Sequence, residues 1–568
     1  MTPLAPIRPA GRREWAALAV VTLAVVVLAI DATVLSLAVP ALTADLAPSA
    51  TALLWIGDVY SFALAGLLVT MGTLADRIGR KRLLLIGSAG FVLASLLAAF
   101  APTPGWLIVG RALLGVAGAT LMPSTLSIIR GLFLDARQRT TAIAIWSAAA
   151  GGGAALGPLV GGALLEHFWW GSVFLLNVPV MLLLIGFGAV LLPESRDPRP
   201  GPFDLVGAAL SVVGIVGPVF AVKQTVSHGV SPAAAVAALL GVVAGVAFVR
   251  RQRRASSPLI DVRLFARPAF TGAVVASLLA IFAFSGLLFF FSPYLQLVRG
   301  DSPQVAGARE LPATLASIAV VAVAGWLVSR WGRGRVIGGG LLLAAAGFAG
   351  LAAAEGLAQF RWLALALVLL GLGVGLAFTL TTDAVLAAVP ADRAGSASAV
   401  AETAYELGVA LGIAVLGSVQ TVLYRHALPE GTDAAVRESL ASAAAGAESA
   451  GDVSLGAARA AFVDAMQATS LIAAVLLVAA AAVAWRVIPS AAEPAGAALA
   501  GPGPAGPGPA GPGPAGPGPA WVGPPGAAPP GAGPGPAGSG PAGPPLGGPD
   551  RAGVAAAGPA ERRNDSAA

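Results

Sequence analysis

The chain has 568 residues, of which 57% are hydrophobic and 11% are charged, and its mean hydropathy is +0.83. Soluble domains carry about 25% charged residues, so this composition excludes a soluble globular protein and indicates a polytopic membrane protein. The formal net charge of +6 comes from basic residues in short loops between apolar runs, which is a membrane pattern and not a nucleic-acid-binding one. Cysteine is absent, which excludes disulfides. Lysine is rare while Ala, Gly, Pro and Arg are abundant, as in GC-rich genomes such as those of actinobacteria.

Apolar runs that are long enough to cross a membrane follow one another along most of the chain, since a span needs about 20 mostly apolar residues. The first run follows Arg8, Arg12 and Arg13, as a signal peptide would. It is too long for one and contains Asp31, so we expect an uncleaved first span. The predicted spans are 16–39, 52–74, 83–101, 105–128, 140–164, 171–192, 203–222, 232–250, 268–291, 305–329, 335–354, 362–384, 396–423 and 467–488, fourteen in all.

These runs predict the organisation of the chain. A cytoplasmic N-terminus at 1–15 precedes an N-terminal six-helix bundle at 16–194, an inserted helix pair at 195–260 and a C-terminal six-helix bundle at 261–490. Basic residues concentrate in alternate loops, which places both termini in the cytoplasm. Residues 424–466 form the one sizeable extracellular loop, where we expect helical pieces that act as a lid or as a solvated connector. Residues 491–568, rich in Gly, Pro and Ala, are predicted to be a disordered cytoplasmic tail.

The loop between spans two and three reads Gly-Thr-Leu-Ala-Asp-Arg-Ile-Gly-Arg-Lys-Arg at 72–82. Glycines allow two helices joined by a tight turn to approach closely, and the positive charge holds the loop in the cytoplasm. Asp76 needs donors, which we expect from the N-terminus of a neighbouring helix. The string resembles, position by position, the loop between helices 2 and 3 of the major facilitator superfamily. This resemblance implies a part in conformational gating for Gly72, Asp76, Arg77, Gly79 and Arg80.

Two spans carry charges that a lipid environment makes costly. Asp31 lies in span one, and a carboxylate inside a span indicates function by default. The surrounding string resembles the first-helix signature of the fourteen-span drug:proton antiporter branch of the superfamily, with Ser36 where that branch usually has Asn. Arg111 in span four stays charged at depth and resembles the fourth-helix arginine motif, which implies a part in proton transfer. The alternative is an arginine that only satisfies backbone carbonyls.

Span two opens with Trp55, Asp58 and Tyr60. By helical rise, Asp58 lies about 9 Å and Asp31 about 12 Å below the outer boundary. Two acids at similar depth can share a cationic substrate or couple their protonation. The pattern Trp-Ile-x-Asp-x-Tyr-Ser resembles the quaternary-ammonium-compound (Qac-type) exporters, and this resemblance covers about 14–490. It implies Asp31 and Asp58 as substrate- or proton-binding acids and Trp55 and Tyr60 as cation–π walls.

Span five contains a glycine-rich string. Gly153 and Gly157 form a small-xxx-small face, and Pro158 frees a carbonyl and bends the helix. With Gly161 and Gly162, the string resembles the antiporter motif of the superfamily, which implies a part in conformational gating. The alternative is a generic packing face.

Span thirteen contains Glu402 and Glu406, which are four residues apart and share a helix face. By helical rise they lie about 9 Å and about 15 Å from the inner boundary. The Qac-type resemblance implies that they bind substrate or protons, although those exporters have further acids where this chain has Ala401 and Ser317. The alternative is that each one only hydrogen-bonds to a neighbouring helix.

Other polar residues are expected to have structural places only. Lys223 is assigned to a loop on the outer side, and Glu310 and Glu355 to the outer surface. Asp383, near the inner end of span twelve, is expected to snorkel or cap. The three histidines have no metal-ligand spacing, so no metal site is predicted.

The sequence has no nucleotide-binding loop, which favours an ion gradient as the energy source. It also has no nucleophile–base pattern, so we expect neither an enzyme nor a cofactor. The resemblance implies an all-α major facilitator fold with fourteen membrane helices and two bundles related by an axis along the membrane normal. It further implies a monomeric, proton-coupled plasma-membrane antiporter that exports lipophilic cations such as quaternary ammonium compounds and dyes. The partners expected are cationic drugs, protons and membrane lipids, but not nucleic acid. Two alternatives stay open: export of an endogenous antibiotic or lipid-like metabolite, and a non-transporting sensor or scaffold.

Overall fold

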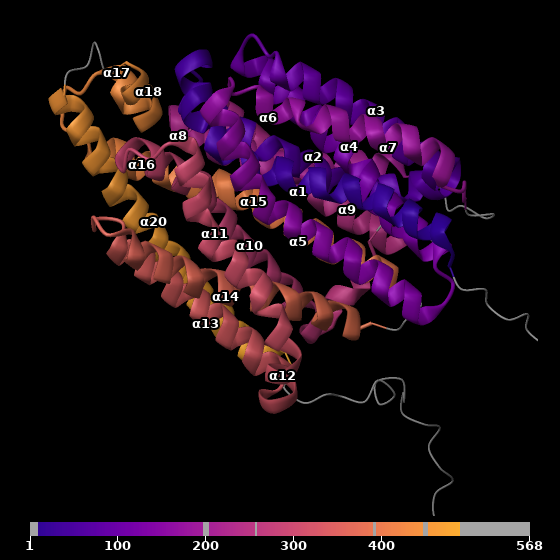
Figure 1. Cartoon of the computed structure of the whole chain (residues 1–568). Helices are drawn as coiled ribbons and strands as arrows, with labels where there is room; N and C mark the ends of the chain where they lie inside the picture. The colour runs from indigo at the N-terminus through magenta and orange to yellow at the C-terminus, as the bar shows by residue number, and fades with distance from the viewer. Residues whose placement is uncertain are drawn as a thin grey trace, which may run out of the picture. The chain divides into compact units, whose positions relative to one another are not determined.

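The computed structural model describes residues 10–196, 204–255, 258, 260–389, 394–446 and 452–488. Within these ranges every regular element is helical (Figure 1). The prediction of an all-α polytopic membrane protein is therefore confirmed. The predicted disordered tail at 491–568 lies outside the described residues.

The first half of the chain folds into long helices with short connections. They are α1 (Arg12–Leu46), α2 (Ala50–Ile78), α3 (Arg80–Ala99), α4 (Pro104–Leu132), α5 (Ala136–His167), the short α6 (Ser172–Leu175) and α7 (Asn177–Leu191). Ser49, Thr103 and Asp135 start α2, α4 and α5 by accepting a hydrogen bond from a backbone N–H three residues on. Gly79 separates α2 from α3 with a φ of 113°, a conformation that only glycine adopts readily.

The second half contains a pair of helices followed by a second set of long ones. The pair is α8 (Leu205–His228) and α9 (Pro232–Arg254). The set is η1 (Val262–Ala266), α10 (Pro268–Pro293), η2 (Tyr294–Val298), α11 (Pro303–Ala319), α12 (Val321–Trp331), α13 (Arg333–Ala354), α14 (Phe360–Ala387), α15 (Ala394–Leu411), η4 (Gly412–Leu416), α16 (Gly417–Ala427), α17 (Ala434–Glu438), α18 (Leu440–Ala445) and α20 (Asp452–Val487).

The number of spans agrees with the fourteen predicted runs. Among the described residues, thirteen helices are long and apolar enough to cross a membrane, or fourteen if one bent pair counts as a single span. That pair is α11 and α12, which are bent by 46°. The predicted span at 305–329 corresponds to this bent pair. The break lies at Val320, whereas Pro312 lies inside α11.

Two apolar cores hold these helices together. One is built mainly from α1 to α7, with Phe91 and Phe174 fully buried, and the other from α10 to α20, with Phe270 and Phe348 fully buried. The two halves meet where α2 packs on α15 and where α5 packs on α11. The bundle boundaries expected from the sequence stay a prediction.

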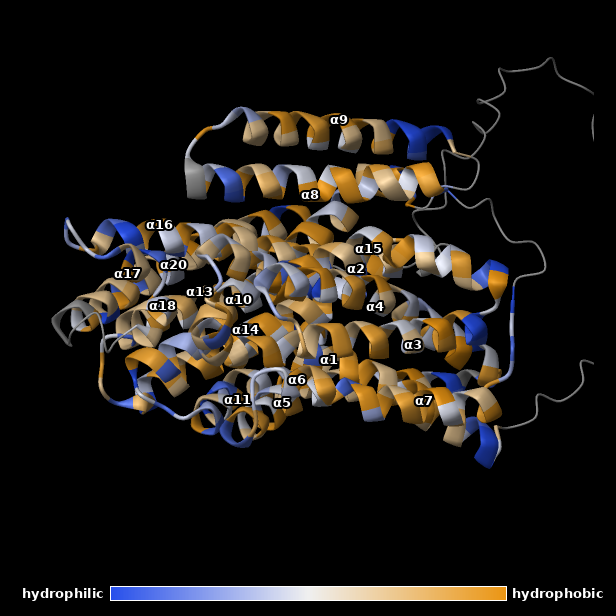
Figure 2. Cartoon of the chain, turned by 90° about the horizontal axis from the view of Figure 1, so that it is seen from above, coloured by the Kyte–Doolittle hydropathy of each residue, from blue (hydrophilic) through white to orange (hydrophobic). Residues whose placement is uncertain are grey.

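The inserted pair lies beside these bundles, with α8 between α9 and the rest of the helices (Figure 2). A small cluster formed by Phe62, Val219, Ala410 and Ala414 joins α8 to α2 and to the α15–η4 region. Gly66 of α2 packs directly against Val212 of α8, where a Cβ on the glycine would lie 2.8 Å from a valine methyl. The pair is therefore attached to the bundles mainly through α8.

In the segment predicted as an extracellular loop, 424–466, α16 continues to Ala427 and α20 begins at Asp452. The helical pieces expected there are present as α17 and α18. Glu438, at the end of α17, accepts a hydrogen bond from the backbone N–H of Ala50 at 2.6 Å and pairs with Arg425 at 3.3 Å. These contacts hold the end of α17 against the start of α2.

Candidate functional site

Asp31 lies at the centre of a buried polar cluster. Its Oδ2 accepts from Nη1 of Arg111 on α4 at 2.7 Å, and both side chains are buried. Its Oδ1 accepts from Nδ2 of Asn177 on α7 at 3.0 Å, and the same amide nitrogen donates to Ser95 on α3 at 3.2 Å. Arg111 also donates from Nε to the Ile56 carbonyl at 3.2 Å. Both oxygens of this carboxylate therefore have partners from the same bundle.

Tyr60 belongs to this cluster, since the Arg111 guanidinium lies 4.7 Å from the centre of its ring. Tyr60 was predicted to line the substrate cavity. This placement does not support that role, because the side chain is buried and its ring contacts Arg111, a cation of the protein itself. Sequence reasoning missed the role of Asn177, although an amide inside an apolar run was a signal that could have found it.

Asp58 forms a second buried ion pair with Lys223. The Lys223 Nζ lies 2.5 Å from Oδ2 of Asp58 and 3.8 Å from the centre of the Trp55 ring. Both charged side chains are almost completely buried. The placement of Lys223 in an outer loop is therefore wrong: α8 continues to His228, and Asp58 compensates the ammonium charge away from water.

Glu402 and Glu406 lie on α15, the helix that packs on α2. Glu406 is buried and hydrogen-bonds to Ser61 of α2, and Arg111 lies within electrostatic range of its carboxylate. Glu402 is only partly buried. Between them, Tyr405 packs on Phe378 of α14 with ring centres 5.2 Å apart. No ion pair to either glutamate is present within the described ranges.

The structure thus brings most of the predicted binding residues together around the N-terminal half of α2. Asp31, Arg111, Tyr60 and Glu406 surround one side of this helix, and Asp58 with Trp55 faces α8 on another. In each of the two ion pairs the formal charges cancel. The glutamates of α15 place two further carboxyl groups at the junction of the two halves.

The loop at 72–82 is arranged differently from the prediction. Asp76 pairs with Arg80 at 2.9 Å, one turn away. The N-terminus of α3 is capped instead by Glu194, which follows α7 and accepts from the backbone N–H of Lys81 at 3.2 Å. Gly79 is required because its φ of 113° is a backbone conformation that L side chains rarely adopt. Because Asp76 is already engaged with Arg80, Glu194 supplies the acceptor for this helix start.

The other two residues implied in gating are less constrained. Gly72 has room for a Cβ at an ordinary 3.6 Å from Pro123, and Arg77 is exposed.

The glycines of α5 make two contacts with different partners. Gly153, Gly157 and Gly161 lie against α1, where a Cβ would overlap Val26, Thr33 and Val34 in turn. Gly162 faces the other half of the protein, and a Cβ there would lie 2.7 Å from the carbonyl oxygen of Pro303. The Pro158 carbonyl in turn packs against Gly307 of α11. The glycine string therefore serves both the α1–α5 contact and the contact between the halves.

Two acids assigned to the outer surface are buried, which corrects that prediction. Glu310 faces Ser292, but neither of its carboxylate oxygens has a well-formed hydrogen bond within the described part of the chain. Glu355, directly after α13, accepts from Ser470 at 3.1 Å. Burial raises the pKa of Glu355 to about 8, and the hydrogen bond from Ser470 opposes this shift. Asp383, by contrast, is largely exposed and pairs with Arg333 at 2.8 Å.

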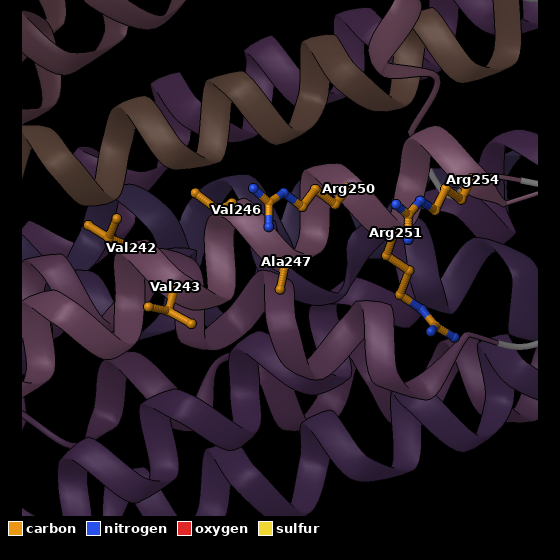
Figure 3. Close-up of a pocket in the computed structure, with 7 residues that line it drawn as sticks. All are labelled: Val242, Val243, Val246, Ala247, Arg250, Arg251 and Arg254. Carbon is orange, nitrogen blue, oxygen red and sulfur yellow. The ribbon is translucent and has the colours of Figure 1, made fainter.

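A groove along α9 lies apart from these clusters (Figure 3). Its lining is apolar along most of the helix and basic near its C-terminal end, and it consists of Val242, Val243, Val246, Ala247, Arg250, Arg251 and Arg254. Arg251 also pairs with Asp204 at 2.8 Å, and this hydrogen-bonded guanidinium lowers the pKa of Asp204. None of the predicted site residues lines this groove.

Comparisons with known proteins agree with the geometry. The family model of the Major Facilitator Superfamily matches residues 21–413. The chain is 48% identical over 482 residues to the multidrug efflux pump LfrA of Mycolicibacterium smegmatis, covering 81% of this chain and 93% of LfrA. It is 40% identical over 407 residues to the methyl viologen resistance protein SmvA of Salmonella typhimurium, covering 71% and 82%. It is 34% identical to the tetracenomycin C resistance and export protein of Streptomyces glaucescens, covering 71% and 76%.

A solved structure supports the fold. The bacterial homologue of the human lysosomal transporter Spinster, inward-facing and unoccupied, has a TM-score of 0.61 and 20% identity, and the match covers 84% of this chain and 97% of that one. The family resemblance carried by the 72–82 loop is thus confirmed. The chain belongs to the major facilitator superfamily and is a multi-pass membrane transporter.

Proposed function

We propose that this protein is a proton-coupled antiporter of the bacterial plasma membrane that exports lipophilic cations, such as quaternary ammonium compounds and dyes, with both termini in the cytoplasm. The similarity to a multidrug efflux pump and to a methyl viologen resistance protein supports this substrate class, since methyl viologen is an organic dication.

The observation that carries the proposal is the placement of buried carboxylates beside aromatic rings at the junction of the halves. Asp58 and the Trp55 ring both contact the ammonium of Lys223, and Glu406 and Glu402 lie on α15, which packs on α2. A carboxylate gives a cation its charge partner, and an aromatic face binds it without hydrogen bonds. This combination suits cations that have no N–H donors.

The Asp31–Arg111 pair suits proton coupling. A proton that reaches Asp31 removes its charge and leaves Arg111 without a buried counter-ion, which is costly in a dry site. Protonation would therefore favour an arrangement in which Arg111 finds another acid, and Glu406 lies within its electrostatic range. In this mechanism Asp58, nearer the outer side, governs substrate release, and Glu402 and Glu406 govern capture from the inner side.

Efflux of a cationic dye tests the proposal. Cells that express the chain are loaded with ethidium and then energised. The account predicts rapid efflux that an uncoupler stops and that quaternary ammonium compounds inhibit competitively. Unchanged efflux after the proton gradient collapses would contradict proton coupling, and the absence of ethidium transport would contradict the substrate class.

The second candidate is export of an endogenous antibiotic or lipid-like metabolite. The similarity to a tetracenomycin C export protein favours it. Competition separates the two: lipophilic cations should compete with one another for ethidium efflux, whereas a neutral polyketide should compete only if the second candidate is right.

A further inference from the structure

The Asp58–Trp55 site already holds a cation in this structure, and that cation belongs to the protein. The ammonium of Lys223 lies 2.5 Å from the Asp58 carboxylate and 3.8 Å from the centre of the Trp55 ring. A carboxylate on one side and an indole face on the other are the two groups that recognise an organic cation. We propose that Lys223 is a built-in competitor, and that an exported cation binds Asp58 and Trp55 only in exchange for it.

This inference rests on the proposed function, because it assumes that the exported ligands are cations. It adds a residue that sets which cations are accepted. A ligand must bind this site more favourably than the Lys223 ammonium does. A lipophilic cation achieves this by burying apolar area against the rings around Trp55. Phe62, which like Trp55 is on α2, provides such area, with its ring centre 6.4 Å from the Trp55 ring. A small hydrophilic cation gains no such area and cannot displace the lysine.

Within the described part of the chain, the helix that carries Lys223 contributes no residue to either of the two large apolar cores, so it can move without opening them. Lys223 is on α8, which belongs to the inserted pair, whereas Asp58 and Trp55 are on α2. Pro218 lies about one turn before Lys223 inside α8, and proline removes a backbone hydrogen bond and permits a bend. Pro218 packs on Gly241 of α9, so both helices of the pair can move as one unit.

Charge balance makes the exchange possible. The charged groups that face Asp58 are Lys223 from α8 and Arg111 from α4, and Glu406 of α15 reaches the neighbouring residue Ser61. Arg111 is committed to Asp31. When Lys223 leaves, Asp58 therefore needs either a ligand cation or a proton, since an isolated buried carboxylate is strongly unfavourable.

The experiment measures equilibrium binding of tetraphenylphosphonium to the purified full-length chain in detergent. The variants are Lys223→Met, Lys223→Arg, Asp58→Asn and the double variant Asp58→Asn/Lys223→Met. We expect Lys223→Met to bind at least about tenfold more tightly than the wild type, because its internal competitor is gone. Lys223→Arg should keep the wild-type affinity, and the double variant should lose the gain.

A second readout separates competition from a structural role. In Lys223→Met the Asp58 carboxylate can be neutralised only by a proton or by the ligand, so tetraphenylphosphonium binding should release a proton and weaken from about pH 8 to about pH 6. The wild type should release fewer protons, because Lys223 keeps the carboxylate charged.

Each outcome decides between the accounts. Equal affinity in wild type and Lys223→Met, or a gain that survives without Asp58, would overturn the inference. Loss of folding in Lys223→Met that Asp58→Asn repairs would also overturn it, in favour of a structural ion pair. If the wild type and all variants bind no lipophilic cation and the wild type exports no ethidium, the proposed function itself fails. Wild-type export with no effect of Lys223→Met defeats the inference alone.

Discussion

Two buried ion pairs lie on opposite sides of α2, and they differ in how completely the protein satisfies them. Asp31 receives Arg111 on one oxygen and Asn177 on the other, and all three residues belong to the first half of the chain. Asp58 has Lys223 as its one close ionic partner among the described residues, and that partner comes from the inserted helix pair. All four charged side chains are buried.

The difference indicates which pair can exchange. Removing Arg111 from Asp31 would break several hydrogen bonds inside one rigid core, so only a proton is small enough to change this carboxylate in place. Moving Lys223 away from Asp58 requires a movement of α8 and leaves the carboxylate open to another cation. We therefore propose that the first pair couples protons and that the second exchanges cations.

The largest effect is expected from Asp31→Asn, which breaks the better satisfied pair. Ethidium efflux should fall to the level of cells without the protein, and loss of one partner of a buried pair costs about 3–5 kcal/mol of stability. The double variant Asp31→Asn/Arg111→Gln removes both charges and should regain thermal stability without regaining efflux. Efflux by either variant would contradict the assignment, provided that immunoblots show equal amounts in the membrane.

A similarly severe loss is expected when α1 is pushed away from α5. Gly157→Leu places a side chain where even a Cβ overlaps Thr33, two residues after Asp31. Gly152 is on the same helix, and a Cβ added there would meet nothing within 4 Å, so Gly152→Leu is the matched control. Efflux should drop more than about tenfold in the first variant and stay near the wild-type rate in the second. Equal effects would show that this helix contact does not matter for transport.

Substitutions of Asp58 and of the two glutamates of α15 should reduce the transport of some cations more than that of others. Asp58→Asn should impair divalent cations more than monovalent ones, because one of two charge partners is lost. Glu406→Gln should weaken binding from the cytoplasmic side several-fold, and Glu402→Gln, at a less buried position, should weaken it less. Dose–response curves with matched mono- and dications measure this. An equal loss of transport for every cation would show that Asp58 and the two glutamates do not have separate roles.

The fold was largely predictable from the sequence, because hydrophobic runs and glycine turns are local signals. The positions of Lys223, Glu310 and Glu355 were not. Each was assigned to the outside because a charge near the end of an apolar run usually marks the boundary of a span. Their burial depends on partners or packing from distant helices, such as Asp58 for Lys223 and Ser470 for Glu355. The bend at Val320 was not predictable either, because no proline lies close to it in the sequence.

A smaller, uniform effect is expected from Asp76→Asn. The Asp76–Arg80 pair is partly exposed and lies outside both clusters, so it should influence the rate of conformational change and leave the binding site intact. Turnover should fall for all cations alike while apparent affinities stay within about twofold. A change in affinity for some cations only would place Asp76 in recognition instead.

The smallest effect on transport is expected at Glu355, which lies outside both ion pairs and where the prediction concerns stability. The pKa of Glu355 is about 8 in the folded protein against an ordinary 4.5, so the folded state binds the proton more tightly than the unfolded state. Stability should therefore decrease as pH rises from about 4.5 to about 8 and then level off. Glu355→Gln keeps a hydrogen-bond acceptor for Ser470 and should flatten this decrease in thermal unfolding curves. An unchanged pH profile in the variant would contradict this origin.

Proteoliposomes provide the most direct test of the central claim, that Asp31 couples protons to cation movement. Purified wild type and Asp31→Asn are reconstituted, the interior is made acidic, and the membrane potential is clamped with valinomycin and equal potassium. The account predicts that ethidium accumulates inside wild-type vesicles and that an uncoupler abolishes this accumulation. Asp31→Asn should still bind ethidium but show no gradient-driven uptake. Equal uptake by the two proteins, or none by a wild type that binds ethidium, would contradict the account.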